Sequence, residues 1–212
     1  LHGIDLGLFH NEKQTGRVWA EALAYNPESK KWEAGKVGFK GSPFGNDEQV
    51  AGFLNVKWAP HFFSFQGIVE EGTLSYNDMF IKPGQIMGFY EAPYFHFKGQ
   101  AMLGKAPLYI QAKVNPAKQF QGNIIVQDKG KREGVVFSMR DARFCESIVG
   151  SLHGLEFHLQ RSQVMSPFSG KVAVRNGNAA TQLFPEGFSL LKDVKNLELV
   201  GSWTNDLMFQ GE

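Results

Sequence analysis

A single cysteine, Cys145, occurs among the 212 residues, so no disulfide bond can form within the chain. Zinc sites built from Cys-x-x-Cys pairs are excluded for the same reason. Arg143 and Glu146 place opposite charges beside the thiol, and this mixed environment does not favour a thiolate nucleophile. We therefore expect a half-buried, unreactive thiol in a reducing compartment.

Long apolar runs are missing as well. No stretch of about 18 residues is apolar throughout, which predicts that no segment spans a membrane. Residues 1–14 include His2, Asp5 and Lys13, and such polar residues are not typical of a signal peptide. The chain begins with Leu1 rather than methionine, as expected of a product cut from a precursor or of a trimmed chain.

Charged residues make up only 20% of the sequence, and 22 Lys and Arg nearly balance 21 Asp and Glu. The net charge of +1 argues against a general nucleic-acid-binding domain, which is usually far more basic. Helix-favouring patterns are scarce, which argues against a helical bundle. The chain instead contains 19 Phe, 5 Tyr, 4 Trp and 24 Gly. So many bulky rings exclude disorder, because they can bury enough apolar area to offset the entropy of the chain.

Apolar and polar side chains alternate along residues 107–115. The apolar set is Leu108, Ile110, Ala112 and Val114, and the second set is Tyr109, Gln111 and Lys113. A period of two predicts a strand that is buried on one side. Ile110→Asp is therefore expected to prevent folding, whereas Lys113→Asp should leave the fold intact.

Similar alternation recurs along the chain and indicates roughly ten strands. The candidates are residues 18–25, 53–58, 62–69, 85–90, 107–115, 123–127, 135–139, 155–160, 171–175 and 197–203. Turn signals such as Pro83-Gly84 and Asn176-Gly177-Asn178 lie between them. The best helical stripe covers residues 141–149. The sequence therefore predicts an all-β, antiparallel sandwich or barrel in one domain.

Recognised catalytic motifs are absent: His-Glu-x-x-His, Gly-x-Ser-x-Gly and phosphate-binding glycine loops do not occur. Glu156 and His158 share one side of a predicted strand, about 7 Å apart, but polar residues are expected on its solvent side. A glycosidase needs two converging carboxylates. Candidates in loops or at strand ends are Glu70, Glu71, Asp78 and Glu91. We predict no catalytic residue, no metal and no cofactor, and therefore not an enzyme.

Two groups of residues are candidates for contacts with partners. Lys129, Lys131 and Arg132 form a basic tip between two predicted strands and are candidates for a weak contact with RNA. Aromatic side chains are enriched at subunit interfaces. The candidate interface residues are Trp19, Trp32, Trp58, Phe62 and Phe63.

Three segments resemble capsid proteins of picornavirus-like viruses. Residues 108–126 (LYIQAKVNPAKQFQGNIIV) are similar to the paired C and D strands of the viral jelly roll. In that family an alternating strand leads through an Asn-containing connection to an aromatic residue, a glycine and a second apolar strand. Phe95-His96-Phe97-Lys98-Gly99 resembles the approach to strand C. Residues 197–209 resemble the last strand and its exit, which in comoviruses and cheraviruses (Secoviridae) carries an Asp followed by an aromatic residue.

The resemblance implies an eight-stranded jelly roll of two facing sheets in residues 67–212, with residues 1–66 as an extension that adds strands. It implies a structural coat subunit that assembles with copies of itself and sister capsid subunits into a small icosahedral shell of an RNA virus. Contact with genomic RNA is then weak or indirect, no membrane is involved, and the location is the virion, or the host cytoplasm during assembly. Gln210-Gly211 is similar to the dipeptide that the polyprotein proteases of such plant viruses cleave.

Two other functions fit the same composition. A lipocalin-like or lectin-like β-protein would hold a small apolar or sugar ligand. A β-sandwich carbohydrate-active enzyme would use carboxylates that the sequence does not place. Size-exclusion chromatography separates the first two, because large assemblies favour the coat subunit and a monomer that retains a small ligand favours the binding protein.

Overall fold

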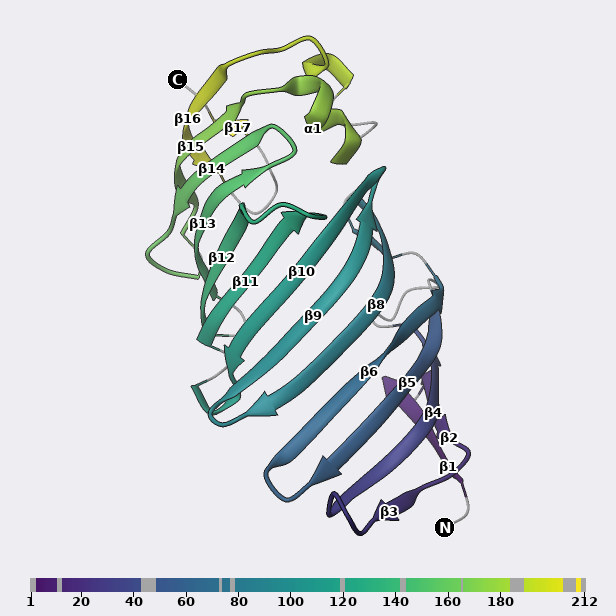
Figure 1. Cartoon of the computed structure of the whole chain (residues 1–212). Coiled ribbons are helices and arrows are strands. Elements are labelled where there is room, and N and C mark those ends of the chain that lie inside the picture. The colour runs from purple at the N-terminus through teal and green to yellow at the C-terminus, as the bar shows by residue number, and fades with distance from the viewer. Residues whose placement is uncertain are drawn as a thin grey trace. The chain divides into compact units, whose positions relative to one another are not determined.

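The computed structural model describes residues 3–10, 13–42, 49–72, 74–76, 79–118, 121–141, 144–164, 166–183, 189–203 and 209–210. Contacts between residues divide the chain into two compact units, unit 1 (Leu1–Met102) and unit 2 (Leu103–Glu212). Within each unit, antiparallel strands pair mainly with their neighbours in the sequence (Figure 1).

Unit 1 is built from strands, and its described residues contain no helix. The strands are β1 (Ile4–His10), β2 (Lys13–Ala20), β3 (Ala24–Asn26), β4 (Lys31–Gly41), β5 (Val50–Ala59), β6 (Phe62–Glu71), β7 (Leu74–Tyr76), β8 (Met79–Glu91) and β9 (Tyr94–Leu103). β1, β2, β4, β5, β6 and β8 pair in that order, and the short strands β3 and β7 pair with β4 and β8. A single layer leaves both sides of the sheet without a covering layer inside the unit.

Unit 2 continues with antiparallel strands and adds short helical segments. Its elements are β10 (Ala106–Asn115), η1 (Pro116–Lys118), β11 (Gln121–Asp128), β12 (Gly134–Asp141), β13 (Phe144–Leu152), β14 (Leu155–Gln160), β15 (Phe168–Val174), α1 (Gly177–Leu183), η2 (Ser189–Leu191), β16 (Leu197–Trp203) and β17 (Phe209–Gln210). Each strand pairs antiparallel with the next one, from β10 through β17. None of the helices among the described residues is long and apolar enough to cross a membrane.

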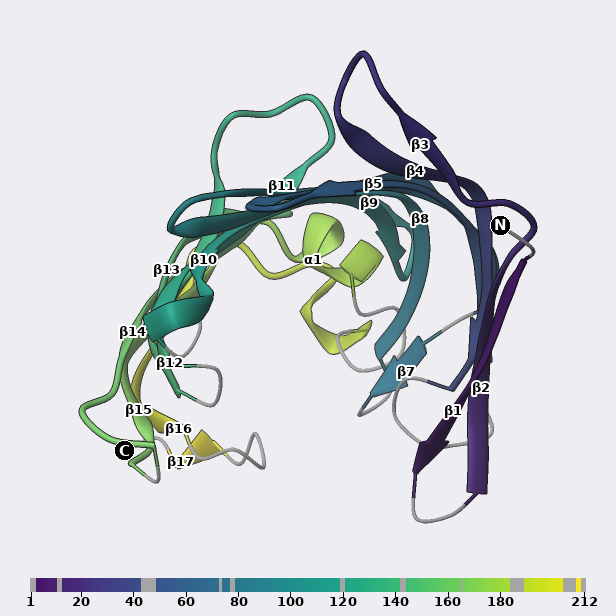
Figure 2. The ribbon, with the colours of Figure 1, turned by 90° about the horizontal axis from the view of Figure 1, so that it is seen from below.

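The core of unit 2 forms where α1 lies against one side of its sheet (Figure 2). Alternation along each strand turns every second side chain towards the helix. The buried residues of this core are Ala106, Leu108, Val135, Leu152, Leu155 and Val174 from the strands and Ala180 and Leu183 from α1. Each fully buried Leu or Val contributes about 1.5–3 kcal/mol relative to an exposed one, so this cluster is the main source of stability in unit 2.

The predicted all-β, antiparallel fold is confirmed. The predicted strand at residues 107–115 corresponds to β10, and Lys113 is exposed as expected. Of the four apolar residues expected to face the core, only Leu108 is buried, at 4% exposed; Ile110, Ala112 and Val114 are half-buried, as are Tyr109 and Gln111, so the predicted contrast between the two sides is wrong along most of the strand. The predicted division at residue 66 lies inside β6, whereas the contacts separate the units after Met102. The eight-stranded jelly roll is not confirmed, because the described pairings follow the order of the chain and a jelly roll pairs strands distant in sequence.

The predicted helix at residues 141–149 is wrong. β13 covers Phe144–Leu152 and pairs with β12 along one edge and β14 along the other. The four-residue spacing of Phe144 and Ile148 suits one side of a helix, but an even spacing also keeps two residues on one side of a strand. The segment is a strand because it hydrogen-bonds to β12 on one edge and to β14 on the other. Those partner strands lie outside residues 141–149, so the pattern within the segment could not reveal them.

The actual helix, α1, begins at residues that the sequence predicted to be a turn. The Asn176 side-chain Oδ1 accepts a hydrogen bond from the Ala179 backbone N–H at 3.1 Å, as an N-cap residue does. The Asn176 carbonyl accepts a second bond, from the Ala180 N–H at 3.1 Å. Seven residues are too few to establish an apolar helical period, so the predicted turn identified only where the helix starts.

Candidate functional site

One side of the unit 1 sheet carries two adjoining rows of aromatic rings, which together are called the aromatic ladder. Its members are Tyr25 on β3, Trp32 on β4, Trp58 on β5, Phe63 and Phe65 on β6, and Phe95 and Phe97 on β9. The first four lie opposite one another across successive strands, in the order Tyr25, Trp32, Trp58, Phe63. Opposite residues of antiparallel strands point to the same side, so these rings form one row across the sheet.

Most neighbouring rings of the ladder are stacked or tilted against one another, and Phe63 and Phe65, with centroids 6.1 Å apart, join the two rows. Trp32 and Trp58 are stacked with ring centroids 6.3 Å apart and planes 14° apart, and Tyr25 lies 5.4 Å from Trp32. Phe65 and Phe95 are stacked 6.2 Å apart.

Gly88 lets the ladder continue across β8. The residue lies opposite Phe65, and a Cβ atom at this position would sit 2.5 Å from Phe65 Cε1 and 2.9 Å from Phe95 Cζ. A side chain there would force both rings away. The glycine therefore allows Phe65 on β6 to reach Phe95 on β9.

The ladder side of β5 and β6 carries no charge. From Gly52 to Trp58 on β5, and from Phe63 to Val69 on β6, every residue on this side is apolar. Several of these side chains remain partly exposed, including Phe63 at 41%. An uncharged, partly exposed aromatic surface of this kind marks a binding surface more often than a solvated one.

The opposite side of the same sheet contains a hollow of about 410 Å³, the polar hollow. Two rows of side chains line it: Glu33, Lys57, Ser64 and Phe89 in one row, and Asn55, Gln66 and Met87 in the other. Lys57 Nζ lies 3.2 Å from Glu33 Oε1. The side of the hollow thus carries charged and amide side chains next to exposed apolar ones such as Phe53 and Ile68.

The structure brings together three of the five candidate interface residues. Trp32, Trp58 and Phe63 are members of the ladder. Trp19 lies on the opposite side, where its ring meets Phe53 edge-on at 6.4 Å. Phe62 is also outside the ladder, with Lys31 Nζ 3.6 Å from its ring centroid. The ladder members Tyr25, Phe65, Phe95 and Phe97 were not among the candidate interface residues, although Phe62-Phe63-Ser64-Phe65 and Phe95-His96-Phe97 carry the alternation that places three of them.

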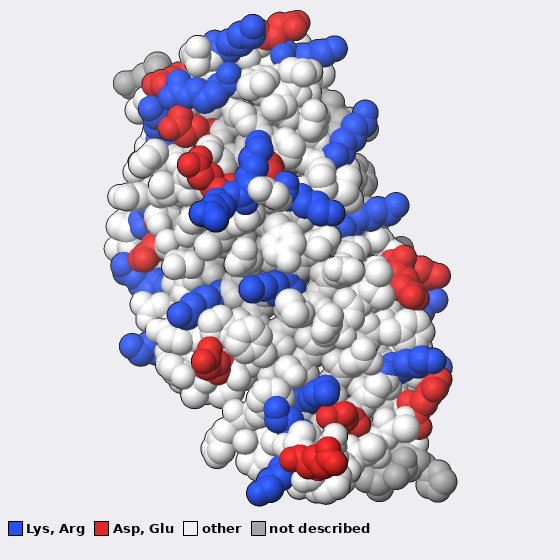
Figure 3. All heavy atoms as spheres, in the orientation of Figure 1, with Lys and Arg blue, Asp and Glu red and all other residues white. Residues whose placement is uncertain are grey.

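The candidate RNA-contact residues, Lys129, Lys131 and Arg132, lie exposed in the turn between β11 and β12. Lys131 Nζ is 2.9 Å from Asp128 Oδ2, so part of the local positive charge is neutralised. Figure 3 shows Lys and Arg interspersed with Asp and Glu over the face in view. A contact with RNA at this turn stays a prediction.

The structure pairs a histidine and a carboxylate that sequence reasoning did not connect. His153 Nε2 lies 2.7 Å from Asp128 Oδ1, and both side chains are largely buried. His153 and Gly154 have positive φ angles of 45° and 75° and form the two-residue turn between β13 and β14. The contact lies between the β13–β14 turn and the end of β11.

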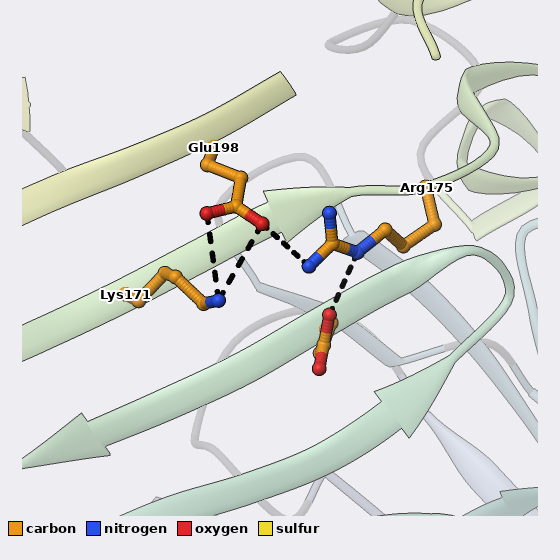
Figure 4. A network of polar contacts seen from close by, with 4 residues as sticks. Lys171, Arg175 and Glu198 are labelled. Carbon is orange, nitrogen blue, oxygen red and sulfur yellow. Dashed lines mark hydrogen bonds and ion pairs between the residues drawn. The ribbon is translucent and has the colours of Figure 1, made fainter. Parts of the chain in front are cut away.

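Glu156 and His158, considered above as an acid–base pair, have no contact with each other among the interactions of the described residues. Glu156 Oε2 accepts a hydrogen bond from Arg175 Nε at 2.8 Å, and His158 is exposed. Arg175 Nη2 also contacts Glu198 at 2.6 Å, and Lys171 Nζ lies 3.5 Å from both oxygens of Glu198 (Figure 4). Hydrogen bonds to both glutamates raise the pKa of Arg175. These residues form an ion-pair network on three neighbouring strands.

The described residues contain no group of three or more His, Cys, Asp or Glu side chains placed to hold a metal ion. Of the four carboxylates considered for glycoside hydrolysis, Asp78 lies outside the described residues. Glu91 Oε2 is 3.7 Å from His96 Nε2, and both Glu70 and Glu71 are exposed on β6.

Comparison of the chain with family models, with curated proteins and with solved structures gives no match. The function is therefore inferred from the geometry of the described residues alone.

Proposed function

We propose that this chain is a binding protein that holds an extended hydrocarbon chain, of the acyl-chain class, along the aromatic ladder. The observation that carries this proposal is the combination of seven rings on one side of the sheet with no charged side chain beside them on β5 and β6. Burying such apolar area contributes about 25 cal/mol per Å², so an apolar ligand gains free energy all along the row.

The dimensions of the ladder favour a long, narrow ligand. The two rows together cross from β3 through β4, β5, β6 and β8 to β9, which is five strand spacings or about 24 Å. A compact ligand would contact only two or three rings. An extended alkyl chain can follow both rows, because they adjoin at Phe63 and Phe65 on β6.

Ring orientation argues against sugars or nucleobases as ligands of the ladder. Flat ligands stack on exposed ring faces. Trp32 and Trp58 each cover one face of the other, and so do Phe65 and Phe95, which reduces the ring face available for such stacking. Ring edges and C–H groups suit methylene groups, which need no hydrogen-bond partner.

The coat-subunit prediction places a second copy of the chain on the same surface. An uncharged patch is compatible with self-association, because a twofold interface then sets no like charges against each other. The chain-order pairing of the strands gives no support to the jelly roll from which that prediction came. We therefore rank the hydrocarbon ligand first and treat self-association as the competing outcome.

Titration of the full chain with bromine-labelled stearic acid tests the proposal, because bromine quenches tryptophan fluorescence on contact. Trp32 and Trp58 lie in the ladder, so quenching with saturation is expected. Phe63→Ser should weaken binding about tenfold or more, because a ring contact is lost. Phe53→Ser is the matched control: Phe53 is 40% exposed against 41% for Phe63, but it lies on the opposite side.

Equal affinity of the two variants, or no quenching of the wild type, would overturn the proposal. Sedimentation velocity of the wild type, Phe63→Ser and Phe53→Ser tests whether the chain self-associates instead. A wild-type dimer or larger assembly that Phe63→Ser dissociates, without stearate binding, would favour the coat subunit instead.

A further inference from the structure

We propose that the polar hollow is a binding site for a neutral saccharide, with one pyranose ring stacked on Phe89. The site lies on the opposite side of the unit 1 sheet from the aromatic ladder. It is therefore independent of the hydrocarbon ligand.

Phe89 has one ring face occupied and one open. His96, on the neighbouring strand β9, stacks on Phe89 with centroids 4.6 Å apart and planes 5° apart. On the other side of Phe89 the opposite residue is Ser64 on β6, whose small side chain leaves space above it. His96 thus backs the ring, and the free face of Phe89 looks over Ser64 into the hollow.

The far wall of the hollow stands at a suitable distance for one sugar ring. Lys57 on β5 lies opposite Ser64, two strand spacings or about 9.6 Å from Phe89. A pyranose ring in contact with Phe89 would fill this gap. The volume of about 410 Å³ falls in the usual range of small-molecule sites, about 300–1,000 Å³.

Both hydrogen-bond donors and acceptors surround the hollow. Asn55 Oδ1 accepts a bond from the Lys36 backbone N–H at 3.3 Å, which turns the amide NH₂ of Asn55 away from this contact and leaves it to donate. Gln66 lies opposite Asn55 on β6, and its side-chain amide can both donate and accept hydrogen bonds. Glu33 accepts and Lys57 donates. Hydroxyl groups donate and accept at once, so a polyol can use this mixed set fully.

The charge balance selects a neutral ligand over an anionic one. Glu33 Oε1 lies 3.2 Å from Lys57 Nζ, so the positive charge that would attract a phosphate is already paired. A nucleotide would need that charge free. The apolar C–H face of a pyranose, in contrast, matches the open face of Phe89 and the side chain of Met87, which is 39% exposed.

Saturation-transfer NMR on the full chain tests the site, with maltose, cellobiose and N-acetyllactosamine as saccharide probes and AMP as the nucleotide probe. We expect transfer to the ring C–H protons of at least one disaccharide. Phe89→Ala should raise its Kd at least tenfold, whereas Phe89→Trp should retain binding because it restores a ring face. Phe53→Ala, on the same side but outside the hollow, should bind as the wild type does.

Gln66→Leu provides a second variant that leaves Phe89 in place, and it should also weaken disaccharide binding. Absence of disaccharide binding by the wild type, or unchanged binding by Phe89→Ala and Gln66→Leu, would overturn the proposal. Binding of AMP in place of the disaccharides would overturn it in favour of a nucleobase site. Stearate binding by Phe89→Ala should match the wild type, which keeps this test separate from that of the ladder.

Discussion

Arg175 Nη2 lies 2.6 Å from Glu198 Oε1 and so connects the residue after β15 with β16. The segment between these two residues contains α1, which supplies two buried residues to the core of unit 2. The ion pair thus joins the two ends of the segment that contains α1. The Arg175 hydrogen bond, together with the charge of Lys171, lowers the pKa of Glu198.

The stabilisation that the Arg175–Glu198 ion pair provides is expected to decrease at low pH. A carboxyl group whose pKa is lower in the folded than in the unfolded chain stabilises the fold above the unfolded pKa, 4.5 for Glu198. That contribution disappears as the pH falls through the lower, folded-state pKa. Glu198→Gln should therefore lose less stability than the wild type between pH 7 and pH 3, measured by urea unfolding. Glu21→Gln, at another exposed position, should follow the wild type; identical acid losses in all three proteins would contradict the prediction.

Leu108→Ala should destabilise the protein by about 2–5 kcal/mol, because it leaves a cavity in the core under α1. Leu108 is 4% exposed, whereas Leu190 is 93% exposed. The same substitution at Leu190 should change the free energy of unfolding by no more than about 0.5 kcal/mol. Denaturant unfolding of the two variants checks this, and similar losses at both positions would show that the core is placed wrongly.

Gly154→Ala and Gly130→Ala test the hairpin turns of unit 2. Both glycines have positive φ angles, 75° and 86°, which cost an alanine about 1 kcal/mol. A Cβ at Gly154 would also sit 2.5 Å from the Asn176 carbonyl oxygen, while nothing lies within 4 Å of one at Gly130. Gly154→Ala should thus be the more destabilising variant in a thermal melt, and the reverse order would argue against the β13–β14 turn as described.

Cys145 should react slowly with iodoacetamide in the folded protein. Burial raises the pKa of its thiol more than the nearby Arg161 lowers it. The sulfur also donates to the Ser147 carbonyl at 3.4 Å. Because the thiolate is the reactive form, alkylation at pH 8 should accelerate markedly in urea. Equal rates, followed by mass spectrometry, would show that the thiol is freely accessible.

Local patterns in the sequence were sufficient for the fold class and for most strands. Alternation at Leu108–Val114 placed β10, because a period of two is a property of the strand itself. It did not show how far the core extends along the strand, since only Leu108 of the four apolar residues is buried there. The same local reasoning failed at Phe144 and Ile148, whose spacing fits both helix and strand. It also failed at α1, which is too short to show a period.

The sequence identified part of the aromatic ladder, since Trp32, Trp58 and Phe63 were predicted to be interface residues. Their alignment in one row depends on the register between β4, β5 and β6. A shift of one residue in that register would turn half of the rings to the other side. The polar hollow depends on register even more, because Glu33, Lys57, Ser64 and Phe89 come from four strands.

The sequence by itself determined an all-β chain rich in half-buried strands, because the alternation of side chains needs no partner strand. Only the tertiary structure decided which strands pair, in what register, and hence that Phe89 stacks on His96 while Asp128 meets His153. These contacts join residues far apart in the chain or on different strands. Their geometry is set by backbone hydrogen bonds that any residue can make, so side-chain identity carries little information about them.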